Sequence, residues 1–369
     1  MSCGLYIHVP FCLHKCPYCD FYSIGYSAET AEKYVNAVIN SFGAFPRTDI
    51  DTVYFGGGTP SLLSPGQIGR ILSAASDRFT VSSGSEITME CNPATADTER
   101  FREYRASGVN RLSIGVQSLH DTVLRESGRI HNADEAVRCV NDAYHAGFEN
   151  ISVDLMMGLP GDDTASFLST LARACELPVK HISAYMLKLM PGTPFGDSPP
   201  ASIADDDLAA EMYESCCSFL EDRGFAQYEI SNFAVPGYES RHNLKYWMLD
   251  PYIGTGPAAH GFLDGSRYSF SPDLPAFLKA YGEGCPDIGS VTDFEGVTDV
   301  SEYIMLRLRT TYGISFNELY ELYNFSFKNE HFRFMDTCVS GGLAERSGDT
   351  FRLTSKGFLL SNEIISRLI

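Results

Sequence analysis

The chain has 369 residues, 44% of them apolar and 12% aromatic, enough for one large domain with a substantial core and a smaller second one. Its 28 Lys and Arg against 47 Asp and Glu give a net charge of -19, which argues against binding to nucleic acid or to an anionic membrane surface. No apolar run reaches the roughly 18 residues of a spanning helix, and the N-terminus lacks the basic and apolar regions of a signal peptide. We therefore predict a cytoplasmic protein that is not an integral membrane protein.

Short apolar runs alternate with longer helical patterns over the first two thirds of the chain. The predicted strands are Leu5–Val9, Thr52–Phe55, Glu86–Glu90, Arg111–Val116, Ile151–Leu155 and His181–Leu187. The predicted helices lie near 28–42, 65–78, 97–107, 132–146, 163–176 and 205–223. Each strand–helix unit takes roughly 25–45 residues, as right-handed crossovers in a parallel sheet require. We predict an α/β fold, a partial six-unit barrel of the TIM type, with its chemistry at the carboxyl ends of the strands.

The last third of the chain has a different pattern. Residues 264–296 are rich in Gly, Pro and Asp and are predicted to form a linker. Helices near 299–311, 315–323 and 328–341, a hairpin over 343–354 and a last helix predict a small α+β module of the winged-helix type. Residues 290–369 hold 8 basic and 11 acidic residues, a net of -3, so packing or protein interaction is favoured over nucleic-acid binding. The expected division is a barrel over 1–235, a segment with the linker over 236–296 and the module over 297–369.

Three closely spaced cysteines, Cys12, Cys16 and Cys19, follow the first predicted strand in a CxxxCxxC pattern. Three thiolates can bind three irons of a 4Fe-4S cluster and leave the fourth iron open to a ligand. A structural zinc site is the alternative, but it needs a fourth Cys or His at a partner spacing such as a second CxxC, which the chain lacks. The other cysteines are scattered, as reduced core thiols are. The triplet therefore favours an iron–sulfur cluster.

The second predicted strand ends in Gly56-Gly57-Gly58-Thr59-Pro60. This run is neither a GxGxxG fingerprint nor a P-loop, and a tight turn explains it as well as a ligand site does. Backbone without Cβ atoms also lets a ligand approach closely. Beside the cysteine triplet, at the end of the neighbouring strand, the glycine run becomes a strong sign of a ligand site.

Together these motifs resemble the radical SAM superfamily, and within it the branch of oxygen-independent coproporphyrinogen III dehydrogenase (oxidase) and its heme-chaperone relatives. The resemblance covers nearly the whole chain, through the segments 6–12, 57–60, 88–93, 113–118, 128–131 and 153–160. It implies a radical SAM barrel with a small C-terminal domain like that of the dehydrogenase. It also implies a 4Fe-4S cluster on Cys12, Cys16 and Cys19, whose open iron chelates S-adenosylmethionine (SAM). In that superfamily an electron from the reduced cluster cleaves SAM to a 5′-deoxyadenosyl radical.

Position by position, the resemblance implies a set of cofactor-binding residues. They are Tyr6, Tyr18, Gly57, Gly58, Thr59, Glu90, Gln117, Arg129 and Asp154. Their chemistry is suitable, because arginine pairs with a carboxylate and carboxylates accept from ribose hydroxyls. Gln117 could instead cap a strand end, and Glu90 or Asp154 could pair with a helix lysine. Whether one or two SAM molecules bind stays open.

Two features separate the members of this branch. The dehydrogenase has a fourth cysteine where this chain has Phe21, and this chain has an HNxxYW element like that of the heme chaperones, made of His242, Asn243, Tyr246 and Trp247. An imidazole can ligate heme iron and aromatic rings can stack on a porphyrin, so these residues and the downstream His260 are heme candidates. Alternatively, the element is a helix start, with Asn243 as its cap and the two aromatic residues packed on the barrel.

The resemblance implies a heme chaperone that binds the cluster, SAM and heme, and passes heme to a hemoprotein, which could be respiratory and membrane-associated. An electron donor such as flavodoxin or ferredoxin would reduce the cluster. The C-terminal module would cover the barrel mouth or contact the recipient. The alternatives are oxidative decarboxylation of coproporphyrinogen III and a radical SAM reaction on another substrate, so enzymatic activity is left open.

Overall fold

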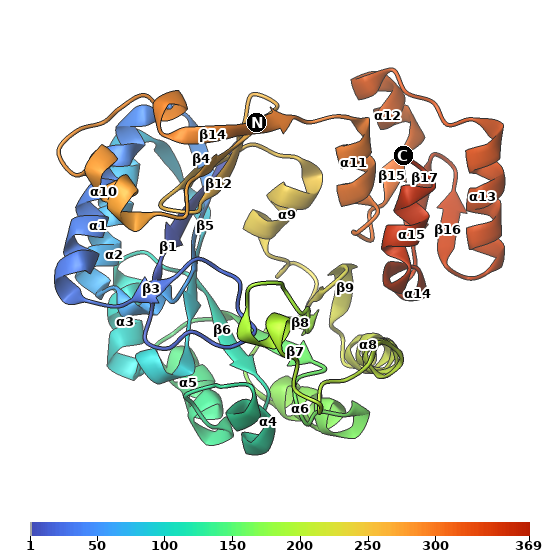
Figure 1. Ribbon diagram of the computed structural model, residues 1–369, viewed down its shortest axis with the longest axis horizontal. Coiled ribbons are helices and arrows are strands. Elements are labelled where there is room, and N and C mark those ends of the chain that lie inside the picture. Colours follow the sequence, from blue (N-terminus) through green and yellow to red (C-terminus); the bar gives the residue numbers. More distant parts are fainter. Residues whose placement is uncertain (1) are drawn as a thin grey trace.

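The computed structural model describes residues 2–369, which form one large domain and a small C-terminal one (Figure 1). The strands are β1 Cys3–Val9, β2 Phe11–Cys12, β3 Ile24–Gly25, β4 Asp49–Gly57, β5 Thr80–Cys91, β6 Arg111–Gln117, β7 Asn150–Met157, β8 His181–Met186, β9 Ala226–Glu229, β10 Asn232–Ala234, β11 Tyr252–Thr255, β12 His260–Leu263, β13 Ser266–Phe270, β14 Thr292–Val297, β15 Ile314–Ser315, β16 Ala344–Ser347 and β17 Thr350–Leu353. The helices are α1 Ala28–Ser41, α2 Pro65–Arg78, α3 Thr98–Ala106, α4 Asp121–Glu126, α5 Ala133–His145, α6 Thr164–Glu176, α7 Pro194–Asp197, α8 Asp206–Glu221, α9 Arg241–Met248, α10 Leu274–Tyr281, α11 Val300–Arg307, α12 Phe316–Tyr323, α13 Asn329–Ser340, α14 Ser355–Leu359 and α15 Ser361–Ser366.

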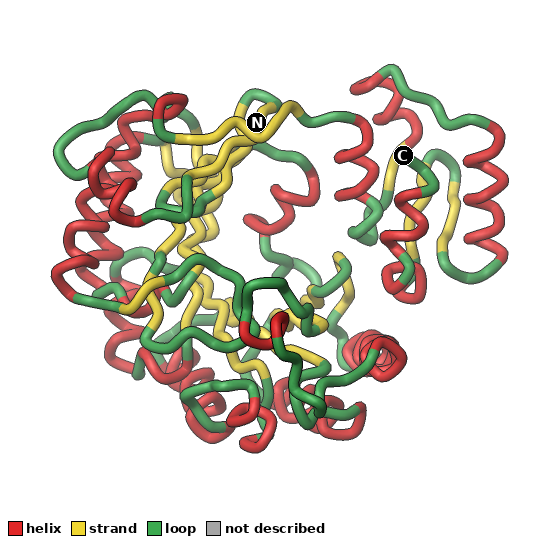
Figure 2. The backbone as a smooth tube through the Cα atoms, viewed as in Figure 1, coloured by secondary structure: helices red, strands yellow, loops and turns green. Residues whose placement is uncertain are grey.

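A curved sheet of 12 strands, in the order β14-β13-β12-β11-β1-β4-β5-β6-β7-β8-β10-β9, dominates the large domain. The run from β11 through β1 to β8 is parallel, and β12–β14 and β9–β10 extend it with antiparallel pairs. Helices α1, α2, α3, α5, α6 and α8 cover the outer face of the sheet (Figures 1 and 2). The six predicted strands are confirmed, and the fold is the predicted partial barrel.

The core lies between the sheet and this outer layer of helices. Strand β1 is buried at nearly every position, as expected of a parallel strand covered on both faces. Helix α5 buries Ala136, Cys139, Val140 and Ala143, a stripe at helical spacing that faces the sheet. Its start is fixed by Asn132, whose side chain accepts from the Glu135 amide at 2.9 Å in a capping box. Sequence periodicity and caps thus determine where each crossover helix begins and which face it buries.

The segment 264–296 differs from the prediction, because it is part of the sheet rather than a linker. Residues 264–296 contain β13, α10 and β14, and β11 pairs in parallel with β1 from Gly4–Tyr252 to Ile7–Thr255. Strand β11 has only four residues, two of them Gly and Thr, so its pattern is too short to show in the sequence. Pairing with a strand nearly 250 residues away fixes its conformation, which tertiary context commonly does for short strands.

The C-terminal domain has helices α11 to α15 and a three-stranded sheet in the order β15-β17-β16. The predicted hairpin is present as β16 and β17, but the single last helix is wrong, since α14 and α15 are separate. The domain meets the barrel at β9, where the Ile230 amide donates to the Arg309 carbonyl at 2.9 Å and the Thr311 amide to the Tyr228 carbonyl at 3.0 Å. None of the helices described is long and apolar enough to cross a membrane.

Candidate functional site

A cavity of about 510 Å³ opens at the carboxyl ends of the parallel strands. Every predicted cluster and cofactor residue lines it except Tyr6: Cys12, Cys16, Tyr18, Cys19, Gly57, Gly58, Thr59, Glu90, Gln117, Arg129 and Asp154. Tyr6 packs behind the wall, with its ring centroid 6.2 Å from that of Tyr54, and its hydroxyl bonds to His8 Nδ1 at 3.1 Å. No residue of 297–369 contributes to the lining, so the C-terminal domain forms no part of the cavity wall.

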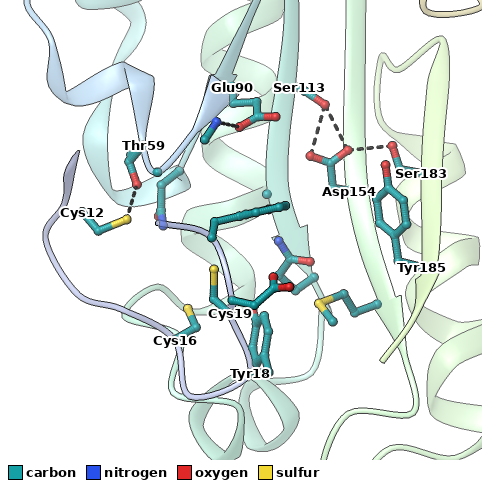
Figure 3. A pocket seen from close by; sticks show the side chains of 18 of the residues that line it. Cys12, Cys16, Tyr18, Cys19, Thr59, Glu90, Ser113, Asp154, Ser183 and Tyr185 are labelled. Atoms are coloured by element: carbon teal, nitrogen blue, oxygen red, sulfur yellow. Dashed lines mark hydrogen bonds between the residues drawn. The ribbon is translucent and has the colours of Figure 1, made fainter. Parts of the chain in front are cut away.

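Cys12 ends β2, Cys16 and Cys19 lie on the loop that follows it, and all three face the cavity (Figure 3). All three are half-buried; Cys12 Sγ is 3.6 Å from Thr59 Oγ1, and Arg129 Nη1 donates to Cys16 Sγ at 3.4 Å. Among residues 2–369 no three Cys, His, Asp or Glu side chains converge closely enough to hold a single metal ion. Three thiolates facing one cavity are the ligand number that a 4Fe-4S cluster with one open iron requires, so the residues present fit such a cluster.

The glycine run brings the end of β4 against the cysteine loop. The amides of Gly58 and Thr59 donate to the carbonyls of Val9 and Phe11 at 2.8 and 2.7 Å. A Cβ atom at Gly58 would lie 2.6 Å from the Phe11 carbonyl oxygen, which no real side chain tolerates. Glycine is therefore required for the two segments to meet, and their contact builds the cavity wall on which the cysteines sit.

Two carboxylates line the cavity without a cationic partner from a helix. Glu90 accepts from the Tyr54 hydroxyl at 2.9 Å and the Gly57 amide at 3.2 Å. Asp154 accepts from the hydroxyls of Ser113 and Ser183 at 3.0 and 2.7 Å (Figure 3). Pairing with a helix lysine, considered above, is thus wrong. Burial, with a smaller contribution from the charge on Asp154, raises the pKa of Glu90 to about 8; burial also raises the pKa of Asp154.

Buried donors without a partner face the same cavity. The hydroxyl of Tyr18 and Nε of Arg129 have no hydrogen-bond partner among the described residues, although Arg129 Nη2 donates to the Gly115 carbonyl at 2.6 Å. Gln117 ends β6 with φ of 66°, a conformation that costs about 1–3 kcal/mol and is common at ligand sites. Unsatisfied donors beside two carboxylates suit a zwitterionic ligand, as SAM is.

Sequence reasoning missed Arg111, which lines the cavity while only 1% exposed, with an Nε that has no partner among the described residues. Arg111, Ser113, Gly115 and Gln117 all line the cavity, because alternate residues of a strand share a face. The polar alternation within the predicted strand Arg111–Val116 was the available signal. An otherwise apolar strand that places polar side chains at every second position indicates a polar barrel interior.

The HNxxYW element begins helix α9, which packs against β4 and α11 (Figure 1). His242 is fully buried, and its ring nitrogens bond to Thr52 Oγ1 and Tyr246 Oη, both at 2.8 Å. Burial lowers its pKa to about 3. The helix cap is Ser240 rather than Asn243, because the backbone N–H of Asn243 donates to Ser240 Oγ. Of the heme candidates only Asn243 lines the cavity; Trp247 is half-buried, and His260 lies exposed on β12.

Replacing His242 with alanine should therefore destabilise the barrel by about 2–4 kcal/mol. The substitution leaves Thr52 and Tyr246 without a buried partner and opens space beneath Tyr54, whose ring stacks on the imidazole at 5.2 Å. Urea unfolding measures this loss. His145→Ala, at an exposed position in the last turn of α5, is the control and should be near neutral. An unchanged midpoint for His242→Ala would contradict the structural role.

Comparison with known proteins identifies the family of this chain. The model of the radical SAM superfamily matches residues 6–174, which include the cysteine loop, the glycine run, most of β1 and strands β2 to β7. The coproporphyrinogen III oxidase HemN of Escherichia coli, described as a radical SAM enzyme, aligns with 99% of this chain and 89% of its own at a TM-score of 0.84. At 21% identity this likeness shows the fold alone. Fold, cysteines and cavity define a radical SAM protein.

Closer relatives are found among proteins named heme chaperone HemW. The one from Bacillus subtilis is 35% identical over 99% of this chain and 98% of its own length, and that from Lactococcus lactis is 31% identical over 99% and 96%. The Escherichia coli protein of that name is 42% identical over 71% of each chain. The chain belongs to the HemW family of the radical SAM superfamily.

Proposed function

We propose that this chain is a heme chaperone that binds a 4Fe-4S cluster, SAM and heme and delivers heme to a hemoprotein. The observation that carries the proposal is full-length similarity to relatives named heme chaperones, in a chain whose cysteine triplet lies on the cavity. Two residues after the last cysteine of the triplet, this chain has Phe21, 58% exposed, where the dehydrogenase is expected to have a fourth cysteine. This difference favours a chaperone over a coproporphyrinogen dehydrogenase.

Within this proposal, different residues of the cavity bind the cluster and SAM. Cys12, Cys16 and Cys19 would hold the cluster, which together with SAM supplies one-electron chemistry when both are bound. Gly57 to Thr59 offer backbone beside the cysteines, and the unpaired donors of Arg129 and Tyr18 would receive a carboxylate. Glu90 and Asp154 would accept from amino or hydroxyl groups. Phe21 and Tyr18 would limit the access of water to the cluster.

The cell compartment and partners belong to the same proposal. All eleven cysteines are unpaired, as in proteins of a reducing compartment, which supports a cytoplasmic location. A flavodoxin- or ferredoxin-type donor would reduce the cluster. Since the C-terminal domain does not line the cavity, its role would be to contact the recipient hemoprotein.

The test is a heme titration of anaerobically reconstituted protein, followed by absorbance. Saturable binding of one heme per chain, followed by transfer to an apo-hemoprotein, is expected. Product analysis with coproporphyrinogen III under reducing conditions is the parallel assay and should show no decarboxylation. Decarboxylation without stoichiometric heme binding would replace this proposal with the dehydrogenase.

A further inference from the structure

An exposed apolar segment leaves strand β8 at the mouth of the cavity. It reads Tyr185-Met-Leu-Lys-Leu-Met190, and Tyr185, Met186 and Leu189 are 39%, 37% and 38% exposed. The Leu187 amide donates to the Met157 carbonyl at 3.0 Å, which holds the segment against β7. The segment therefore has a fixed backbone and leaves large apolar side chains in water.

The cysteine loop presents a second apolar edge to the same cavity. Leu13 and Phe21 are 59% and 58% exposed, and Phe21, Tyr185 and Met186 all line the cavity. Exposed apolar side chains concentrated around one cavity mark a surface for an apolar ligand rather than ordinary scatter. The polar interior formed by Arg111, Glu90 and Asp154 lies on other elements, so the mouth and the interior have different chemistry.

Two cations accompany these apolar edges. Lys15 and Lys188 both line the cavity and are exposed. A flat apolar ligand with carboxylate groups at its rim matches apolar walls flanked by lysines. Heme has this composition, with two propionates on an apolar macrocycle.

The iron of such a ligand would need a donor atom at the mouth. His242 lies outside the lining and has no free ring nitrogen. His181 lines the cavity, but its nitrogens bond to Ser152 Oγ and Tyr228 Oη, both at 2.7 Å. His14 also lines the cavity and is exposed, but it stands between Cys12 and Cys16, within the loop that carries the cluster thiolates. On the segment 185–190, Met190 is half-buried and Met186 is the exposed thioether, a ligand that heme iron accepts.

We propose that heme binds across the mouth of this cavity, with Met186 Sδ as an axial ligand and Lys188 paired with a propionate. This inference rests on the proposed heme-binding function and assigns it to the 185–190 segment. The HNxxYW element would then support the barrel from inside through His242, and the heme would lie on the side of the cysteine loop.

The experiment compares Met186→Leu with the control Met305→Leu, a half-buried methionine of α11 that does not line the cavity, in reconstituted protein titrated with heme. Met186→Leu should remove the near-infrared sulfur-to-iron charge-transfer band of the ferric complex and raise Kd about tenfold. Met305→Leu should retain both the band and the affinity. Because Met186 is exposed, its substitution should not impair folding, which circular dichroism verifies.

A second comparison tests the propionate contact. Wild type should bind heme about tenfold more tightly than heme dimethyl ester, and Lys188→Glu should remove most of that preference. Unchanged band and affinity in Met186→Leu, or loss of the band in His14→Ala instead, would overturn the assignment of the ligand. Absence of stoichiometric heme binding by the wild type would overturn the proposed function itself, together with this inference.

Discussion

Replacing Cys16 with serine should remove the iron–sulfur cluster and leave the barrel folded. A 4Fe-4S cluster held by three thiolates has no spare protein ligand, so losing one thiolate should reduce the iron bound from about four atoms per chain to fewer than one. The fold should persist because Cys16 lies half-buried on a loop and lines the cavity rather than the core. Iron and acid-labile sulfide assays, with absorbance near ~400 nm, measure the loss.

The matched control is Cys285→Ser, because Cys285 is exposed and does not line the cavity. It should retain the full iron content after the same reconstitution. Circular dichroism of both variants verifies that the barrel is intact. An iron-to-protein ratio in Cys16→Ser equal to that of the wild type would contradict the cluster assignment.

The second large effect concerns the pH dependence of stability through Glu90. A carboxyl whose pKa is about 8 in the folded chain and near 4.5 when unfolded holds its proton more tightly in the folded state. Below pH 4.5 Glu90 is protonated in both the folded and the unfolded state, so it does not change the free energy of unfolding. As pH rises from 4.5 to 8, the unfolded state ionises first, so the free energy of unfolding falls; above 8 the loss is complete.

Glu90→Gln should remove this fall in the free energy of unfolding. Full burial of the carboxyl would make the fall roughly 5 kcal/mol, but the carboxyl faces an open cavity, so we expect about 3 kcal/mol. The variant should be slightly less stable than the wild type at pH 5, since its amide cannot accept both hydrogen bonds, and clearly more stable at pH 9. Urea unfolding of apo protein across this range measures the difference. The exposed Glu103→Gln serves as the control, and parallel pH curves for Glu90→Gln and wild type would refute the buried carboxyl.

The barrel could be read from the sequence because its signals are local. Apolar runs, helical stripes such as that of α5 and caps such as Asn132 each depend on a few neighbouring residues. The cysteine loop and glycine run were equally visible, since their spacing alone restricts the chemistry. Most of the predicted site residues accordingly meet at one cavity.

The remaining features depend on contacts between distant segments. Residues 264–296 looked like a linker, because β13 and β14 form a sheet only through their pairing with β12 and with each other, at the edge that β11 joins to β1. The sequence around His242 contains an imidazole, which can ligate heme iron. Whether its ring nitrogens are free to do so depends on Thr52, nearly 200 residues away. Tyr6 was expected in the cavity, yet the position of Tyr54 places it behind the wall.

The pairing of β1 with β11 also has a consequence for the order of folding during synthesis. Strand β1 lies between β4 and β11, so one of its edges stays open until Tyr252–Thr255 has been made. Contacts of such sequence separation form slowly, and an exposed strand edge invites pairing with another chain. A nascent chain that ends before residue 250 would carry a nearly complete barrel with an open seam, which makes this stage of synthesis the one at which the protein most needs protection from aggregation.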